Sequence, residues 1–212
     1  MVIVEFVPVV EGLLDRFAGL ADRPATDRRS LRAIGDDEIL ARVVSDSICM
    51  SSYKATIQGS KHKRVPENIA DKPVMIGHEL SGEILEVGPK WKDQFSPGQR
   101  FSIQPALNYK PVLDGMGAPG YSYQYIGGDA THIIIPNEVM ELGDLLPYDG
   151  PAYYLASLAE PVSCIVGTFH AMYHTEKYKY VHKMGIAPGG KMAILAGAGP
   201  MGMGAIESAV HN

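Results

Sequence analysis

The stretch VMIGHELSGEILEVG, residues 74–88, decides the fold class of this 212-residue chain. Its second half alternates apolar and polar side chains with a period of two, which is typical of a strand with one buried face. Its glycines indicate bends or bulges within the strand, and Gly88-Pro89 indicates a turn after it. The stretch therefore predicts a bent strand in a mainly β domain.

Segments on both sides of this stretch predict further short strands. Strands are expected at 38–47, where the run EILARVVSDS leads to Cys49, and at 99–105 and 130–136. The intervening segments 54–73 and 106–129 are polar or rich in glycine and proline, so we expect loops there. Short strands separated by such turns predict a barrel-like or sandwich-like domain.

The pattern changes near residue 150. Apolar residues recur with helical spacing over Tyr153–Tyr173, and Lys191–Ala196 (KMAILA) reads as a short buried strand. A glycine-rich loop follows, and then apolar residues with helical character up to Asn212. We therefore expect the mainly β domain to be followed by the truncated start of an α/β domain.

Gly197, Gly199 and Gly202 satisfy the pattern G-x-G-x-x-G, with Pro200 and Met201 inside it. After a strand and before a helix, such glycines allow a tight turn, close approach of a pyrophosphate and close helix packing. The helix N-terminus then offers free N–H groups to the phosphates. The alternative is a glycine-rich turn that binds no ligand. Because the residue that contacts the ribose lies about 20 positions further on, NAD cannot be told from NADP, and we expect this chain alone to bind cofactor poorly.

Four residues are candidate metal ligands: Cys49, His78, Glu79 and Glu160. Zinc binds thiolate, imidazole and carboxylate, and a catalytic site uses three protein ligands with one position left open. The spacing alone is a weak signal, because no short C-x-x-C or H-x-x-x-H pattern is present. Cys49 as a small buried apolar residue, and His78 as a hydrogen-bonded strand residue, remain open alternatives.

Composition excludes several classes of function. Apolar residues make up 46% and charged residues 20% of the chain, as in soluble globular proteins, and the net charge of −5 gives no reason to expect nucleic acid. No apolar run is long enough to span a membrane. Two cysteines make no disulfide framework, so we expect a cytoplasmic protein.

Taken in order, five motifs resemble the zinc-containing medium-chain dehydrogenase/reductase family over residues 36–212. They are SICMSS (47–52), GHELSGE (77–83) with Val87-Gly88, PGQRF (97–101), Glu160-Pro161 and the glycine loop. The resemblance implies a GroES-like β domain that carries a catalytic zinc, followed by a Rossmann domain that binds NAD or NADP. The expected divisions are an atypical segment 1–35, the GroES-like domain 36–150, and a linking helix with the first βα unit of the Rossmann domain, 151–212.

Within this family, stretches such as GYSYQYIGGDATHIIIPNEVME (120–141) and LAEPVSCIVGTFHAMYH (158–174) resemble L-sorbose-1-phosphate reductases, relatives of sorbitol dehydrogenase. By position, Cys49, His78 and Glu160 match zinc ligands, and Glu79 matches a ligand or the carboxylate beside it. Ser51 matches the hydroxyl that relays the substrate proton. Cys164 matches no ligand and is expected to be structural. The lobe 105–130 has no cysteine, so the second, structural zinc of many relatives should be absent.

The resemblance implies hydride transfer between NAD(P)H and a ketose or polyol, with sugar phosphates among the expected substrates. It also implies that the full-length form is a homodimer or homotetramer, with no nucleic acid or membrane as a partner. A phosphate would need cationic contacts, for which Lys54, Lys61, Lys63 and Arg64 lie near Cys49 in sequence, although a solvated loop is the simpler interpretation for most of them. Two alternatives remain open: a non-catalytic GroES-like metal-binding fragment, and a zinc-free reductase of the same superfamily.

Overall fold

The computed structural model describes residues 3–6, 8–9, 27–180 and 182–211. The chain forms two compact units, residues 1–159 and 160–212. Residues 10–26, within the atypical segment 1–35, lie outside the described residues. Within the described residues, no helix combines the length and the apolar character needed to cross a bilayer.

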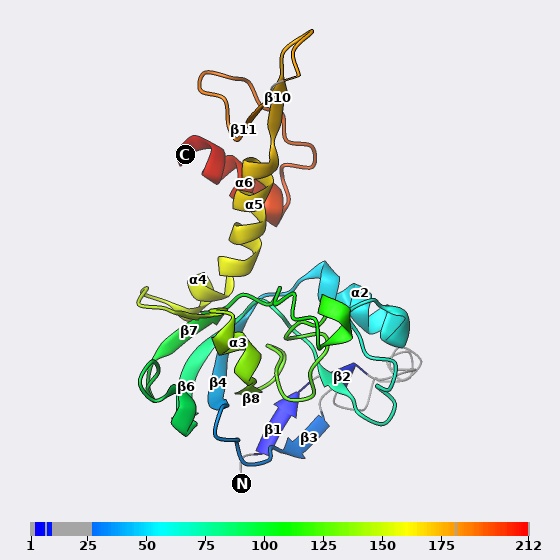
Figure 1. Cartoon of the computed structure of the whole chain (residues 1–212), viewed down its shortest axis with the longest axis vertical. Helices are drawn as coiled ribbons and strands as arrows, with labels where there is room; N and C mark the ends of the chain where they lie inside the picture. Colours follow the sequence, from blue (N-terminus) through cyan, green and yellow to red (C-terminus); the bar gives the residue numbers. More distant parts are fainter. Residues whose placement is uncertain (1–2, 7, 10–26, 181, 212) are drawn as a thin grey trace. The chain divides into compact units, whose positions relative to one another are not determined.

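A five-stranded antiparallel sheet forms the centre of the first unit (Figure 1). Its strand order is β8 (His132–Ile135), β4 (Ile39–Asp46), β6 (Leu80–Val87), β7 (Arg100–Ile103) and β9 (Leu145–Pro147). The alternating half of the 74–88 stretch is therefore the middle strand. The strands predicted at 38–47, 99–105 and 130–136 are confirmed as β4, β7 and β8, each slightly shorter than expected.

Two short antiparallel pairs are the other strands in the described part of this unit. β1 (Ile3–Phe6) pairs with β3 (Asp27–Ser30), and β2 (Pro8–Val9) pairs with β5 (Val74–Met75). Apart from these strands, the first unit contains short helices: η2 (Pro89–Trp91), η3 (Leu113–Gly115), α3 (Asn137–Glu141) and α4 (Tyr153–Ser157). The predicted irregular lobe at 106–129 is confirmed, since η3 is its one regular element among the described residues.

The main core lies against the sheet. Its fully buried members include Ile39, Ile84, Phe101 and Ile133, one from each of β4, β6, β7 and β8. A second, smaller core packs α2 (Met50–Gln58) against the 65–76 segment and the irregular lobe. This second core matters for the site, because it holds the helix that follows Cys49 against the lobe.

The prediction of a loop over 54–73 is wrong for residues 54–61, which are helical. α2 continues to Gln58 and is followed by the turn η1 (Gly59–Lys61). The helix persists because no glycine or proline occurs between Met50 and Gln58. It ends at Gly59, which adopts φ 53°, a backbone conformation that favours glycine.

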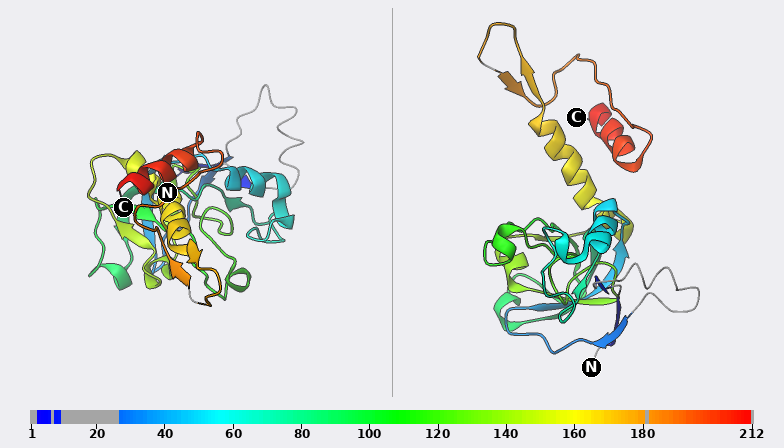
Figure 2. Two further views of the ribbon diagram at one scale, coloured as in Figure 1. Left: turned by 90° about the horizontal axis from the view of Figure 1, so that it is seen from above. Right: turned by 90° about the vertical axis from the view of Figure 1, so that its right-hand side faces the viewer.

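The second unit contains two helices, α5 (Ala159–Ala171) and α6 (Pro200–His211). Between them, β10 (Tyr173–Thr175) and β11 (His182–Met184) pair as an antiparallel hairpin. Figure 2 shows this hairpin at one end of α5. Helical spacing over 153–173 is confirmed as α4 and α5, separated at Leu158. The buried strand predicted at 191–196 is wrong: the segment forms no strand and is largely exposed. A strand exists only when it pairs with another, and this segment has no partner among the described residues.

Candidate metal centre

Pairing of β4 with β6 brings the ends of two motifs together. In the register of these strands, Asp46 lies opposite Leu80. The pairing extends one step further, because the amide of Ser47 donates to the carbonyl of Glu79 at 3.1 Å. Cys49, the N-cap of α2, therefore lies beside the His78-Glu79 pair. One ligand atom from each of Cys49, His78 and Glu79 lies within 4.8 Å of the others.

His78 is buried, at 4% exposure, and both of its ring nitrogens contact hydroxyl groups. Ser52 Oγ lies 3.0 Å from Nδ1, and the Tyr121 hydroxyl lies 3.1 Å from Nε2. Burial lowers the pKa of His78 to about 4, the charge of Arg64 acts in the same direction, and Glu79 opposes both. The imidazole is thus neutral near pH 7, which is the form that binds a metal.

Glu79 is also buried, and its two carboxylate oxygens have different surroundings. Ser47 Oγ donates a hydrogen bond to Oε2. Oε1 lies 3.9 Å from Nε2 of His78. Because one oxygen is held by Ser47, the other faces the imidazole in a fixed orientation, as expected for a carboxylate positioned toward an ion.

Gly77 allows this arrangement because it has φ 93° and no side chain. A Cβ at this position would lie 2.4 Å from Asp46 Oδ2 and 2.5 Å from the amide of Asp129. Asp46 uses its other oxygen to accept the Glu79 amide at 3.1 Å. Burial raises the pKa of Asp46, and the neighbouring Asp129 carboxylate acts in the same direction.

Cys49 is partly buried and makes no disulfide. Burial raises the pKa of its thiol, whereas hydrogen bonds from the amide and hydroxyl of Ser51 act in the opposite direction. Ser51 itself is exposed. A cavity of about 180 Å³ opens next to the thiol, and its lining includes Cys49, Ser52, Tyr53 and Asp129. The site therefore has both a potential thiolate and space beside it.

The remaining predicted residues belong to the second unit. Glu160 lies in the first turn of α5, and the thiol of Cys164, one turn later, donates to its Oε1 at 3.5 Å. Cys164 is exposed on the helix. The role of Glu160 as a ligand and the structural role of Cys164 both stay predictions.

In the glycine loop, α6 begins at Pro200, directly after Gly199. A Cβ on Gly202 would lie 2.5 Å from the Cα of Gly197, so the first turn of the helix packs closely on the loop. This close approach requires glycine at position 202. The loop's role in cofactor binding stays a prediction.

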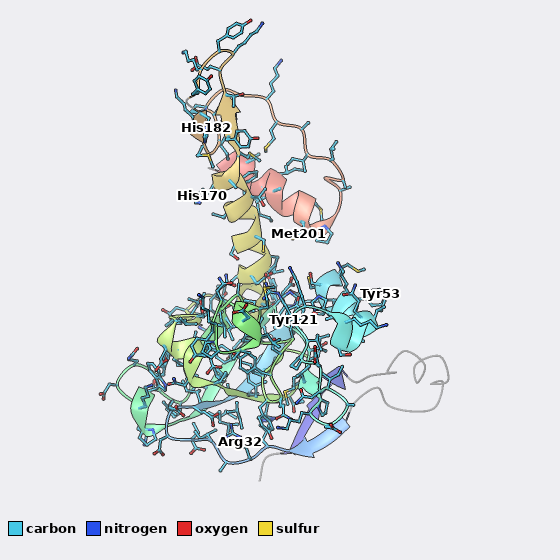
Figure 3. All side chains as sticks on the ribbon, turned by 45° about the vertical axis from the view of Figure 1, so that its right-hand side comes forward. Arg32, Tyr53, Tyr121, His170, His182 and Met201 are labelled. Carbon is cyan, nitrogen blue, oxygen red and sulfur yellow. The ribbon has the colours of Figure 1, made fainter. Side chains whose placement is uncertain are left out.

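Three residues at the site were not predicted: Ser47, Ser52 and Tyr121. Ser52 could have been suspected, because it lies three positions after Cys49 at the start of a helix and thus on the same face. Tyr121 lies in the irregular lobe, and no sequence signal connects it with His78. Figure 3 labels Tyr121 and, on the neighbouring helix α2, Tyr53. The second core, which includes Ala55 of α2, holds Tyr121 against this helix.

The three donor types fit zinc. A thiolate, a neutral imidazole and a carboxylate are the ligands that zinc uses in proteins, and three protein ligands are typical of a site with an open coordination position. No other cluster of three such donors occurs among the described residues.

Comparison with known proteins identifies the first unit. Residues 35–143 match the alcohol dehydrogenase GroES-like domain. The chain is 52% identical over 182 residues to L-sorbose 1-phosphate reductase of Klebsiella pneumoniae, covering 86% of this chain and 44% of that protein. It is 54% identical over 181 residues to mannitol-1-phosphate 5-dehydrogenase of Aliivibrio fischeri, covering 85% of this chain and 42% of that protein. The chain thus spans less than half the length of these two relatives.

A solved structure shares the fold. The cobalt- and zinc-bound thermostable alcohol dehydrogenase of Pyrobaculum aerophilum superposes with a TM-score of 0.69 at 15% identity, covering 99% of this chain and 57% of that one. The predicted fold class and the predicted family are both confirmed by these matches. The chain belongs to the medium-chain dehydrogenase family, whose members carry an alcohol dehydrogenase GroES-like domain.

Proposed function

We propose that this chain supplies the zinc-binding part of an oxidoreductase that transfers a hydride between NAD(P)H and a polyol or ketose, in particular a sugar phosphate. One observation carries the proposal: ligand atoms of Cys49, His78 and Glu79 lie within 4.8 Å of one another. The named relatives, a sorbose-phosphate reductase and a mannitol-phosphate dehydrogenase, support the substrate class.

In this proposal Cys49 binds zinc as a thiolate, His78 as a neutral imidazole and Glu79 as a carboxylate. By the family resemblance, Glu160 is proposed as a further candidate ligand. When bound, the zinc acts as a Lewis acid that stabilises negative charge on the substrate oxygen. The protein's own groups fix the ligands: Ser52 contacts Nδ1 of His78, and Ser47 donates to Glu79.

Ser51 and the glycine loop have separate roles. Ser51 is exposed and next to the thiol, so its hydroxyl can pass a proton between the substrate oxygen and solvent. Gly197, Gly199 and Gly202, with Pro200 and Met201, form the phosphate-binding turn for NAD or NADP. The cofactor supplies the hydride, and the protein positions it.

The decisive experiment is the metal content of the purified chain and of two matched variants. We expect about one zinc per chain, loss of that zinc in Cys49→Ala, and no loss in Cys164→Ala, which removes the other cysteine. Absence of zinc from the unaltered chain would favour a zinc-free reductase or a non-catalytic fold. Equal zinc in both variants would contradict the assignment of Cys49.

A further inference from the structure

A run of positive charge lies next to the candidate metal centre. Between Asp46 and Glu67 the sequence has no acidic residue, and over 54–64 it carries Lys54, Lys61, Lys63 and Arg64 together with His62. This local excess of positive charge contrasts with the net charge of −5 of the whole chain. Such a segment attracts anions, and the question is whether the fold connects it to the site.

Two aromatic contacts make that connection through Tyr121. The His62 ring stacks on the Tyr121 ring, with centroids 5.8 Å apart and planes inclined by 9°. The Tyr121 ring in turn lies 4.7 Å from the ring of His78, and its hydroxyl contacts Nε2. The centroids of the His62 and His78 rings are therefore no further apart than the 5.8 Å and 4.7 Å distances added together. A six-carbon chain with a terminal phosphate can bridge such a span.

His62 is held with a donor available for an anion. The amide of Arg64 donates to Nδ1 of His62 at 3.3 Å, which places the ring hydrogen of the neutral form on Nε2. Burial lowers the pKa of His62, and the charges of Lys54, Arg64 and Lys63 act in the same direction. The positive charges of these three side chains therefore act on the His62 ring.

Arg64 is fixed in place beside His62. Its Nη1 donates to the carbonyl of Met116 at 3.0 Å, and its own carbonyl accepts from Ser122 Oγ at 2.6 Å. Its charge also lowers the pKa of His62. A guanidinium has five N–H donors in a planar fork suited to phosphate, so one contact to Met116 leaves donors for an anion.

We infer that Lys54, His62, Lys63 and Arg64 form a binding subsite for the phosphate group of the substrate, with Tyr121 between this subsite and His78. The inference rests on the proposed function, because it assigns a position to one end of a phosphorylated polyol whose reacting carbon is held at the metal centre. It makes phosphorylated substrates preferred over their free polyols through contacts remote from the zinc ligands.

The test follows His62 by NMR in the zinc-loaded chain during titration with glucitol 6-phosphate, with glucitol, and with inorganic phosphate. We expect glucitol 6-phosphate and inorganic phosphate to shift the His62 ring signals and to raise its pKa, because an anion stabilises the imidazolium. Glucitol should leave His62 unchanged. The double variant Lys54→Gln/Lys63→Gln, which alters two exposed side chains, should weaken binding of the phosphate ester about tenfold or more.

Lys92→Gln is the matched control, because Lys92 is exposed and lies after η2 rather than in the 54–64 segment. Equal weakening by Lys92→Gln, or an unmoved His62 at saturating phosphate ester, would overturn the subsite. In Cys49→Ala, loss of zinc with His62 still responding to inorganic phosphate would support the subsite independently of the metal. Zinc retained by the unaltered chain with no response of His62 would reject the subsite and leave the proposed function standing.

Discussion

Ser52 Oγ lies 3.0 Å from Nδ1 of His78, so a neutral hydroxyl orients the imidazole proposed as a zinc ligand. The other ring nitrogen, Nε2, faces Glu79 Oε1 at 3.9 Å. A contact that fixes the ring on one side determines which nitrogen is presented to the ion.

Removing this hydroxyl should weaken zinc binding without unfolding the chain. We expect Ser52→Ala to lower zinc affinity about 10–100-fold, the range typical of residues that orient a metal ligand. Ser52→Thr keeps the hydroxyl and should restore most of the affinity. The measurement is competition with a chromophoric chelator, and Ser96→Ala in an exposed turn is the control. The same affinity for Ser52→Ala as for Ser96→Ala would contradict this role.

Zinc should stabilise the first unit. A ligand that binds only the folded state, at a hundredfold excess over its Kd, raises the free energy of unfolding by about 2.7 kcal/mol. Trp91, the single tryptophan and 6% exposed in the main core, reports unfolding of this unit by fluorescence in urea. We expect the increase to be lost in Glu79→Gln and kept in Glu86→Gln, a change of an exposed residue on β6, the strand that directly follows Glu79. An unchanged increase in Glu79→Gln would show that Glu79 is not a zinc ligand.

Gly77→Ala should be much more destabilising than Gly98→Ala, although both glycines have positive φ, 93° and 84°. The backbone strain of a side chain in this region, of order 1–3 kcal/mol, is common to the two variants. At Gly77 the new Cβ would also lie 2.4 Å from Asp46 Oδ2, whereas nothing lies within 4 Å at Gly98. Urea denaturation of both variants measures the difference, and equal losses of stability would show that the contact with Asp46 relaxes freely.

Protonation of Glu38 should remove a small part of the stability in acid. The hydrogen-bonded Arg32 guanidinium holds the pKa of Glu38 below its ordinary value. A carboxyl with a lowered folded-state pKa contributes stability above its unfolded pKa of about 4.3, and this contribution is lost as the pH falls through the lower folded value. Because Arg32 is 45% exposed, the contribution is at most about 1 kcal/mol.

The check is urea denaturation of Glu38→Gln and of the unaltered chain at a series of pH values. Glu38→Gln should be less stable near pH 7, and the difference should shrink as the pH falls below about 4. A difference that stays constant down to the lowest pH at which the chain folds would mean that the ion pair makes no contribution and that another contact of Glu38 is responsible.

The sequence by itself determined the central strands and the identity of the candidate ligands. Alternation over Leu80–Val87 predicted β6, and the apolar runs around Ile39 and Ile133 predicted β4 and β8, because a strand with a buried face leaves a local pattern of period two. The sequence-based prediction failed where a strand needs a neighbouring strand to pair with: Lys191–Ala196 has the composition of a strand but forms none.

Only the tertiary structure decided which groups surround His78. The register of β4 against β6 places Cys49 beside His78 and Glu79, although Cys49 lies about thirty residues before them in the chain. Tyr121 reaches His78 from an irregular lobe, where no periodicity links residues that are distant in sequence. Hydrophobic spacing records which face of an element is buried, whereas the meeting of two loops depends on packing of the whole unit, which no local pattern encodes.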